Sequence, residues 1–423
     1  MKIVVVGGGS TYTPELVDGV ARLQHELPIS EIVLVDPDVG RRDLLAGVSQ
    51  RILDAQGAPV RVRASADVAE AADGAVAVLL QLRVGGQAAR ARDESWPLEC
   101  GCLGQETTGA GGLAKALRTV PVVLDIAEQV RRVNPDAWIV DFTNPVGIVT
   151  RALLTQGHKA LGLCNVAVGL QRFFAARLDV APERISLDHV GLNHLTWERA
   201  VRVLDEDGGP GEDVLPRLLV EDGETIAKHL HHPLELVRAV RALPSYYLRY
   251  FYEHDTVVRE QTGVPSRAEQ VAGMEAELLE MYADPALHEK PELLQHRGGA
   301  FYSEAAIALV ASLVNDRRDV QVVNTFNRGT YGFLPDDMVV EIPAVVGAHG
   351  ATPVVPAPLD PAKAGLVAHV AAYEQLALEA ALHGGRDRVV EALLAHPLIG
   401  QWDQATWLAD RLLAENARFL AWA

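Results

Sequence analysis

Cys164 and His194 are the residues whose types most directly suggest chemistry at a metal ion. Each follows a short apolar run that we predict to be a strand, and strand ends are common places for ligand-binding side chains. A thiolate and an imidazole that leave other positions open suit a catalytic rather than a structural divalent site. A lone cysteine is more often a small core residue and a lone histidine a structural one, so spacing alone favours the plainer interpretation.

Tyrosines and arginines supply two further candidate groups. Four of the nine tyrosines lie between residues 244 and 252, where helical spacing favours packing over catalysis. Arg83, Arg90 and Arg92 follow a predicted strand, and a guanidinium there could bind a phosphate with two parallel hydrogen bonds. The alternative for the arginines is surface pairing with the acidic residues beside them.

The first strand of the chain ends in glycines that could bind a dinucleotide. Residues 3–6 are apolar and mostly β-branched, Gly7-Gly8-Gly9-Ser10 follows them, and residues 15–27 are predicted to form a helix. Backbone N–H groups at such a turn and the positive end of a helix dipole bind anions such as a pyrophosphate. Tyr12 replaces the third glycine of the usual fingerprint, and the alternative is a tight turn without a ligand.

Asp36 strengthens the dinucleotide interpretation. It stands at the end of a second predicted strand, residues 31–35, where a carboxylate can accept hydrogen bonds from the ribose hydroxyls of NAD. A carboxylate at this place favours NAD over NADP. Arg41 and Arg42 are near enough in sequence to keep NADP open.

Alternating strands and helices must position these residues. From residue 1 to about 164 the alternation predicts a doubly wound parallel sheet of Rossmann type, with ligands at the carboxyl ends of its strands. We interpret the polar, glycine-rich residues 105–112 either as a flexible loop or as a lid over a cleft. The predicted strands after the first two are 59–62, 74–80, 137–142 and 160–163, and the predicted helices after the first are 40–56, 67–72 and one that follows Pro145.

The chain changes character after residue 180. Residues 185–190 and 195–205 are predicted antiparallel strands, and the remainder is predicted to be mainly helical. Because 423 residues exceed one ordinary core, we predict two domains. Residues 1–190 would be an NAD-binding Rossmann domain, and residues 191–423 a mixed α+β, mainly helical domain for substrate, metal and oligomerisation. The cleft between them is the expected site.

The composition argues against several classes of partner. A formal net charge of −18 disfavours nucleic acid and anionic membranes, which would repel the chain. Three cysteines are too few for a disulfide framework, so we expect a reducing, cytoplasmic location. The first residues lack the apolar stretch of a secretory signal. The longest apolar run, residues 305–314, is half of the roughly 20 residues that a membrane-spanning helix needs.

Taken together, these segments resemble glycoside hydrolase family 4, the NAD- and manganese-dependent 6-phospho-glycosidases. The resemblance extends over nearly the whole chain, with the motifs in the expected order. The motifs are Gly7-Gly8-Gly9-Ser10-Thr11-Tyr12-Thr13-Pro14, Arg83-Val84-Gly85-Gly86, Gly104-Gln105-Glu106-Thr107, Phe142-Thr143-Asn144-Pro145, Gly162-Leu163-Cys164-Asn165-Val166, Gly191-Leu192-Asn193-His194, Arg297-Gly298-Gly299-Ala300, Val323-Asn324-Thr325, Asn327-Arg328-Gly329 and Leu334-Pro335-Asp336.

The resemblance implies a role for each candidate residue. Cys164 and His194 would bind Mn²⁺ or another divalent metal. Tyr247 would be the catalytic base, and Asn165 would also belong to the catalytic group. The substrate phosphate would be held by Arg90 and Asn144, with Ser10 as a third candidate. The residues implied in NAD binding are Gly7, Gly9, Ser10, Asp36 and Glu106.

The pair Cys164-Asn165 resembles the 6-phospho-β-glucosidase branch, because the α-branch is expected to carry an acidic residue after the cysteine. Ala167 replaces the proline usual two residues after that asparagine, so the loop is expected to be less rigid. The resemblance also implies a lactate/malate dehydrogenase-like fold and a homodimer or homotetramer.

The implied reaction is a transient oxidation. Hydride leaves C3 of the sugar for NAD⁺, which acidifies the C2 proton for removal by Tyr247; the aglycone is then eliminated, water adds and the hydride returns. The alternatives are a relative acting on 6-phospho-α-glucosides, an NAD-dependent 2-hydroxyacid dehydrogenase, and a nucleotide-sensing protein without chemistry.

Overall fold

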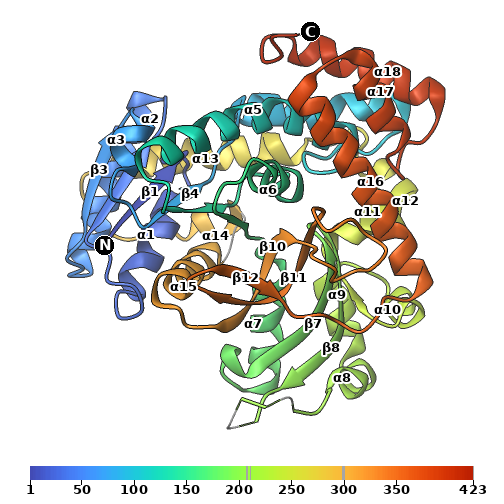
Figure 1. Cartoon of the computed structure of the whole chain (residues 1–423), viewed down its shortest axis with the longest axis horizontal. Coiled ribbons are helices and arrows are strands. Elements are labelled where there is room, and N and C mark those ends of the chain that lie inside the picture. The colour runs from blue at the N-terminus through green and yellow to red at the C-terminus, as the bar shows by residue number, and fades with distance from the viewer. Residues whose placement is uncertain (206–207, 210, 298–300, 423) are drawn as a thin grey trace.

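A parallel sheet is the central element of the computed structural model, which describes residues 1–205, 208–209, 211–297 and 301–422 (Figure 1). Six strands pair in parallel in the order β3-β2-β1-β4-β5-β6, which confirms the Rossmann-type sheet. The strands are β1 (Lys2–Val6), β2 (Glu31–Val35), β3 (Arg61–Ser65), β4 (Ala77–Leu80), β5 (Trp138–Asp141) and β6 (Ala160–Gly162).

Helices cover both faces of this sheet. They are α1 (Thr13–Arg22), α2 (Val39–Ala55), α3 (Val68–Ala72), α4 (Gly86–Ser95), α5 (Gly109–Val133), α6 (Val146–Thr155), α13 (Arg267–Ala283), α15 (Tyr302–Asn315), α16 (Pro361–His383), α17 (Arg386–Leu394) and α18 (Trp402–Asn416). Val4 and Val6 pack into a core with α5, α6 and α16 to α18, whereas Ile3 and Val5 pack into a second core with α1, α2 and α15. Figure 1 shows α5 and α15 on opposite sides of the sheet. Because both faces are buried, these strands are continuous apolar runs.

The first helix is shorter than predicted. Prediction placed it at residues 15–27, but α1 starts at Thr13, since Pro14 is well accommodated in a first helical turn. It ends at Arg22, and Leu27 is buried from a turn instead of from the helix. The start of α1 therefore lies closer to the glycine turn than the sequence indicated.

Three antiparallel strands, which the sequence analysis did not predict, extend the parallel sheet beyond β6. They are β10 (Asp319–Phe326), β11 (Val339–Gly347) and β12 (Gly350–Pro353), and they complete a nine-stranded sheet among the described residues. Asn324 of β10 is opposite Gly162 of β6. A Cβ on Gly162 would lie 2.9 Å from the Cβ of Asn324 and 2.2 Å from the Thr150 hydroxyl, so glycine permits this contact. The division into domains at residue 190 stays a prediction.

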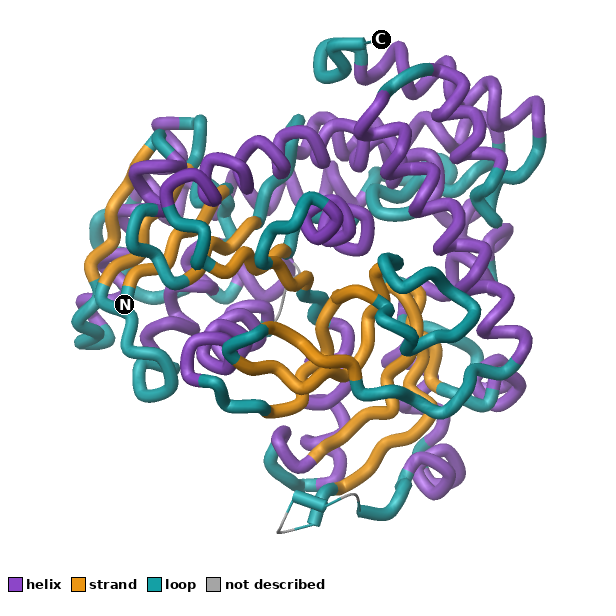
Figure 2. Tube along the Cα trace, viewed as in Figure 1, coloured by secondary structure: helices purple, strands orange, loops and turns teal. Residues whose placement is uncertain are grey.

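A second sheet carries the hairpin that was predicted after residue 180. It consists of β7 (Ile185–Leu192), β8 (Leu195–Val203) and β9 (Leu243–Pro244), all antiparallel. Its strand β7 packs against β11 of the larger sheet, and Figure 2 shows helices around both sheets. The remaining helices are α7 (Val166–Leu178), α8 (Leu215–Glu221), α9 (Gly223–Leu230), α10 (Leu234–Val240), α11 (Arg249–Tyr252), α12 (His254–Gln261) and α14 (Leu293–Arg297), with short 3₁₀ turns η1 (Trp96–Cys100), η2 (Pro182–Arg184) and η3 (Tyr246–Leu248).

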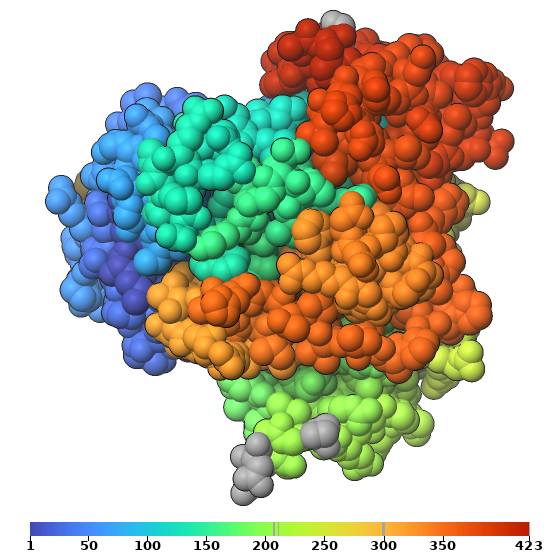
Figure 3. All heavy atoms as spheres, viewed as in Figure 1, coloured from blue at the N-terminus to red at the C-terminus, as the bar shows by residue number. Residues whose placement is uncertain are grey.

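Segments far apart in the sequence share one surface. In the face shown in Figure 3, residues near 320–355 (orange) lie between the N-terminal part (blue to green) and the C-terminal helices (red). Within the described part of the chain, we find no helix that combines the length and the apolar character needed to cross a membrane.

Candidate active site

A polar cavity of about 840 Å³ lies at the carboxyl ends of the parallel strands. Gly7 follows β1, Asp36 follows β2, Leu82 follows β4, and Asn165 follows β6. Tyr247, from η3, closes the other side. A crevice at this edge, where the strand order reverses, is the usual ligand site of doubly wound sheets.

The turn after β1 fits the pyrophosphate and ribose of a dinucleotide. Gly7 has φ +87°, and a Cβ there would lie 2.7 Å from the carbonyl oxygen of Gln81. The Gly9 N–H donates to Asp36 Oδ2 at 3.0 Å, which fixes the carboxylate beside the turn. With the N-terminus of α1, this arrangement places the positive end of a helix dipole and an acceptor for hydroxyl groups side by side. Arg41 also lines this end of the cavity, and its Nε donates to the Gly9 carbonyl at 3.0 Å.

Glu106 is the centre of a buried ionic cluster. It pairs with Arg83, with Arg90 (Nε to Oε1, 3.2 Å) and with Lys115 (Nζ to Oε2, 2.6 Å). Burial opposes the ionisation of Glu106, but Arg83 and the other two cations outweigh it and hold its pKa well below the usual range. Glu106 lines the cavity, and its predicted role in cofactor binding stays a prediction.

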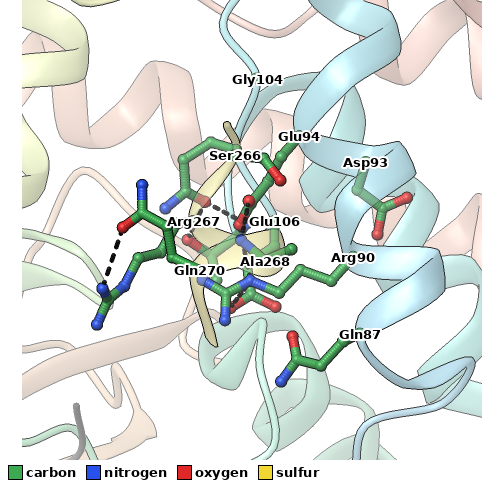
Figure 4. A network of polar contacts seen from close by, with 12 residues as sticks. Gln87, Arg90, Asp93, Glu94, Gly104, Glu106, Ser266, Arg267, Ala268 and Gln270 are labelled. Carbon is green, nitrogen blue, oxygen red and sulfur yellow. Dashed lines mark hydrogen bonds and ion pairs between the residues drawn. The ribbon is translucent and has the colours of Figure 1, made fainter. Parts of the chain in front are cut away.

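Arg90 is oriented by acidic side chains and keeps part of its guanidinium free (Figure 4). Its Nε donates to Glu94 Oε1 at 2.7 Å, and Glu94 Oε2 accepts from the Ala268 N–H at 2.7 Å at the start of α13. The two Nη groups of Arg90 make no hydrogen bond with any described residue, and the side chain lines the cavity. Arg92, by contrast, is mostly exposed and pairs with Glu415. Of the two, only Arg90 is placed to bind a ligand.

Asn144 and Ser10 lie in the same cavity as Arg90. The Asn144 Oδ1 atom is buried without a partner in the described part of the protein, which leaves it for a ligand. Ser10 Oγ accepts from the Tyr12 N–H at 3.2 Å and lies 3.5 Å from Arg297 Nη2. The three side chains predicted to hold the phosphate therefore line one cavity.

Cys164, His194 and Tyr247 come from three different elements. Tyr247 lines the cavity, whereas Cys164 and His194 do not, and Cys164 is buried. Cys164 follows β6, and His194 stands in the turn between β7 and β8 with φ +63°. The rings of His194 and Tyr247 stack with centroids 3.6 Å apart. Burial and then the nearby Cys164 raise the pKa of Tyr247, which places Cys164 within electrostatic reach. His194 and Tyr247 both line a second, small pocket of about 20 Å³.

The donor atoms fit a borderline divalent metal. Burial lowers the pKa of His194 to about 4, so its ring is neutral and has a lone pair to donate. Burial and the charge of Glu341 raise the pKa of the Cys164 thiol, so a metal would have to displace its proton. No group of three or more His, Cys, Asp or Glu side chains forms a metal site in the described ranges. A metal held by these two residues would keep positions open for substrate oxygens.

A buried polar network centred on Glu341 lies next to Cys164 and contacts Asn193, the residue before His194. Glu341 of β11 accepts from Asn193 Nδ2 at 2.8 Å and from Asn324 Nδ2 at 2.9 Å, and it lies 3.2 Å from His189 Nε2. Burial opposes the charged form of His189, but Glu198 and Glu341 outweigh it and raise its pKa to about 10. The network supplies a fixed negative charge next to Cys164.

The glycine-rich loop, predicted to be either flexible or a lid, is held at both ends by side chains from distant segments, and its motion stays a prediction. The Gln261 side-chain amide binds Gly104 on both sides, with Gly104 N–H to Oε1 at 3.2 Å and Nε2 to the Gly104 carbonyl at 3.0 Å. At the other end the Gly109 N–H donates to His396 Nε2 at 2.9 Å, and α5 starts there. The loop is an inner wall of the site.

Several lining residues received no role from the sequence. Tyr302 is half-buried beside Phe142, with ring centroids 5.5 Å apart, and Arg297 pairs with Glu275 at 2.8 Å. Arg297 belongs to a quoted motif whose next three residues, 298–300, lie outside the described ranges. Glu94 lies in no motif. Thr107 ends the motif at residues 104–107 but received no role, because the roles of both residues depend on contacts between distant segments.

The fold is of the Rossmann type, with the cavity at the sheet edge where this class of protein usually binds its ligand. Malate dehydrogenase from Salinibacter ruber shares the fold, with a TM-score of 0.52 at 17% identity over 92% of this chain and 99% of the other. The model of "Family 4 glycosyl hydrolase" matches residues 2–180, and that of its C-terminal domain matches residues 189–399. The chain belongs to family 4 of the glycosyl hydrolases and is a glycosidase.

Relatives in this family match over nearly the full length. A protein of Bacillus subtilis named "Probable 6-phospho-beta-glucosidase" is 37% identical over 99% of this chain and 97% of its own. The 6-phospho-β-glucosidase of Thermotoga maritima, solved with manganese, NAD⁺ and glucose-6-phosphate, has a TM-score of 0.92 at 33% identity and 99% coverage of both chains. A protein of Clostridium acetobutylicum named "Phospho-alpha-glucosidase PagL" is 29% identical over 98% of this chain and 97% of its own.

Proposed function

We propose that this glycosidase hydrolyses 6-phospho-β-glucosides with the help of NAD and a divalent metal, Mn²⁺ being the expected one. The observation that carries the proposal is the single cavity that contains a dinucleotide turn, an arginine with free Nη groups and a phenol stacked on an imidazole. The higher identity to the β-glucosidase relatives supports the β-branch. When bound, NAD⁺ and the metal supply hydride acceptance at C3 and Lewis-acid polarisation of the C2 and C3 oxygens.

Arg90 and Asn144 are proposed to hold the 6-phosphate. The free Nη groups of Arg90 suit two parallel bonds to phosphate oxygens, and Glu94 and Glu106 fix the guanidinium before the substrate arrives. The Nδ2 group of Asn144 would donate to a phosphate oxygen, and its unpartnered Oδ1 atom would accept from a sugar hydroxyl. Binding energy from the phosphate, which does not react, can then be used to place C3 at the nicotinamide.

Tyr247 is proposed to remove the C2 proton. Burial, Cys164 and Glu106 all raise its pKa, so the phenol stays protonated in the protein alone. The charge of a metal held by Cys164 and His194 would lower this pKa and allow the phenolate to form. The stacking on His194 fixes the plane of the phenol ring next to the proposed metal ligand.

Asn165 supports the choice of the β-branch. It lies at the start of α7 and lines the cavity directly after Cys164. An amide can donate a hydrogen bond to a sugar or aglycone oxygen, but it cannot protonate a leaving group as a carboxylic acid would. We propose that Asn165 orients the substrate, and we assign no residue as the leaving-group acid.

An assay with 4-nitrophenyl 6-phospho-β-glucoside tests the proposed function. We expect release of 4-nitrophenol only when NAD⁺ and Mn²⁺ are both present, with no net formation of NADH. Turnover without NAD⁺ would contradict the redox route, and faster turnover of the α-anomer would move the enzyme to the other branch. Accumulation of NADH with a 2-hydroxyacid would favour the dehydrogenase, and binding without turnover would favour the sensor.

The assembly and the location are also proposals. We propose a homodimer or homotetramer that acts in the cytoplasm on a phosphorylated disaccharide or aryl glucoside. The three free cysteines, one of them a proposed metal ligand, are compatible with a reducing compartment. Light scattering of the purified protein would give the oligomeric state.

A further inference from the structure

We propose that Thr107 and Gln105 are positioning residues that hold His194 as its Nδ1–H tautomer, so that the lone pair of Nε2 is presented to the metal. The inference rests on the metal site of the proposed function. It adds a role for Gln105 and Thr107, which the mechanism above does not use.

The hydrogen-bond directions follow from one backbone N–H group. The Thr107 N–H, which can only donate, points at the Gln105 side-chain atom Oε1 at 2.5 Å, so that atom is the amide oxygen and not the nitrogen. The same Oε1 atom lies 2.8 Å from Thr107 Oγ1. An amide oxygen cannot donate, so the single hydroxyl proton of Thr107 is directed to Gln105.

The direction of that hydroxyl fixes the imidazole. Thr107 Oγ1 lies 3.1 Å from His194 Nδ1. Its proton is already used towards Gln105, so Oγ1 accepts, and Nδ1 must carry the hydrogen. A neutral imidazole has one N–H group, which leaves the lone pair on Nε2. The hydrogen-bond partner of one ring nitrogen commonly determines that the other nitrogen binds the metal.

The loop is held firmly enough to impose this choice. The Gln105 Nε2 group donates to the Tyr250 hydroxyl at 3.3 Å, which holds the other end of the amide. Gln261 and His396 fix the backbone on either side at Gly104 and Gly109. Thr107 comes 87 positions before His194, so the contact joins the parallel-sheet region to the β7–β8 turn.

Thr107→Val is the direct test, because valine has nearly the same shape and keeps the backbone N–H bond to Gln105. We expect the Kd for Mn²⁺, measured from free-Mn²⁺ electron paramagnetic resonance with NAD⁺ present, to rise about 10- to 100-fold, the usual effect of losing such a partner. Thr107→Ser keeps the hydroxyl and should restore the Kd to near the wild-type value. Thr262→Val, at an exposed site after α12, is the matched control and should leave the Kd unchanged.

The outcomes separate this inference from the proposed function. Wild-type Mn²⁺ affinity in Thr107→Val, with NAD⁺ binding intact, would overturn the positioning role. A lowered affinity that Thr107→Ser fails to restore would also overturn it, since the hydroxyl would then be irrelevant. If His194→Ala binds Mn²⁺ as the wild type does, the proposed metal site itself fails. Gln105→Leu removes the acceptor and gives a second variant, for which we expect the same direction of change.

Discussion

At the scale of single residues, Arg90 shows how neighbouring charges prepare a side chain for a ligand. Two carboxylates contact its Nε side, and its Nη side stays free in the cavity. Lysine cannot reproduce this geometry, because an ammonium group is a point charge without a planar fork. The identity of the residue as arginine therefore matters as much as its charge.

We predict that Arg90→Lys lowers kcat/KM for the 6-phosphorylated substrate by about 10- to 100-fold, as expected for the loss of a charged hydrogen bond. The rate on the unphosphorylated glucoside, already low, should hardly change. Steady-state kinetics on the two substrates measure the difference. Arg92→Lys, on the same helix but at the surface, is the control. An equal loss on both substrates would mean that Arg90 does not contact the phosphate.

Tyr247 allows a test of the elimination route. If its phenolate takes the C2 proton, product formed in D₂O should carry deuterium at C2, because the base can exchange with solvent before it returns the proton. Tyr247→Phe should suppress both hydrolysis and the C2 label, as followed by mass spectrometry. Tyr246→Phe is the control, since Tyr246 lines the same cavity beside it. Hydrolysis without label at C2 would refute the route, and loss only in Tyr246→Phe would show that the other tyrosine is the base.

The sequence could predict the identity of these residues but not their contacts. Cys164, His194 and Tyr247 stood out only through the resemblance, because spacing alone favoured structural roles for them. The contact of Thr107 with His194 spans 87 positions and depends on how two regions pack. No local pattern carries such information, so the partner of a candidate ligand has to come from the structure.

At the scale of elements, the prediction succeeded for the first two strands of the chain, which are continuous apolar runs. Strand β2 was predicted with its observed bounds, and β1 to within one residue. Strand β10 was missed, because its buried residues include Asn324 and Thr325, which are polar. Asn324 is buried to bind Glu341. Because Asn324 and Thr325 are polar, the sequence of β10 lacks the apolar pattern by which buried strands are recognised.

The junction of β6 and β10 gives a prediction about stability. Gly162→Ala would place a Cβ within 3 Å of Thr150, Val146 and Asn324, so we expect the free energy of unfolding to fall by about 1 to 3 kcal/mol. Gly169→Ala is the matched control, since nothing lies within 4 Å of its Cβ inside α7, and it should stabilise by about 0.5 to 1 kcal/mol. Urea unfolding measures both. Equal stability of the two variants would show that the sheet can shift at β6.

At the scale of the whole molecule, the C-terminal helices stabilise the site through His396. This histidine is buried between the Gly109 N–H and the ring of Tyr373, at 4.3 Å between ring centroids. Burial, together with His369 and His254, lowers its pKa to about 3. The folded chain therefore keeps it neutral where the unfolded chain, with an ordinary pKa near 6.5, takes up a proton.

The sign of the resulting pH dependence is fixed. Between pH 6.5 and 3 the unfolded state binds more protons at His396 than the folded state does. The contribution of His396 to the free energy of unfolding is therefore complete above pH 6.5 and is lost as the pH falls. We predict that His396→Gln is less stable than wild type at pH 7, and that the gap narrows by roughly 1.4 kcal/mol per pH unit below 6.5. Urea unfolding at pH 7, 6 and 5 measures the gap. A constant gap would mean that His396 is protonated in the folded protein.

The antiparallel extension of the sheet has a consequence for the order in which the chain is made. Translation proceeds from the N-terminus, and early segments can fold first. Residues 1–180 can form the glycine turn and expose the Cys164 thiol, but Glu341, which binds Asn193 behind that thiol, is synthesised much later. The pairing of β10 with β6 is also long-range and therefore slow to form. A nascent chain can therefore form its nucleotide-binding turn well before Cys164 is covered, and a ribosome that stalls before residue 341 leaves this thiol uncovered at an unfinished sheet edge.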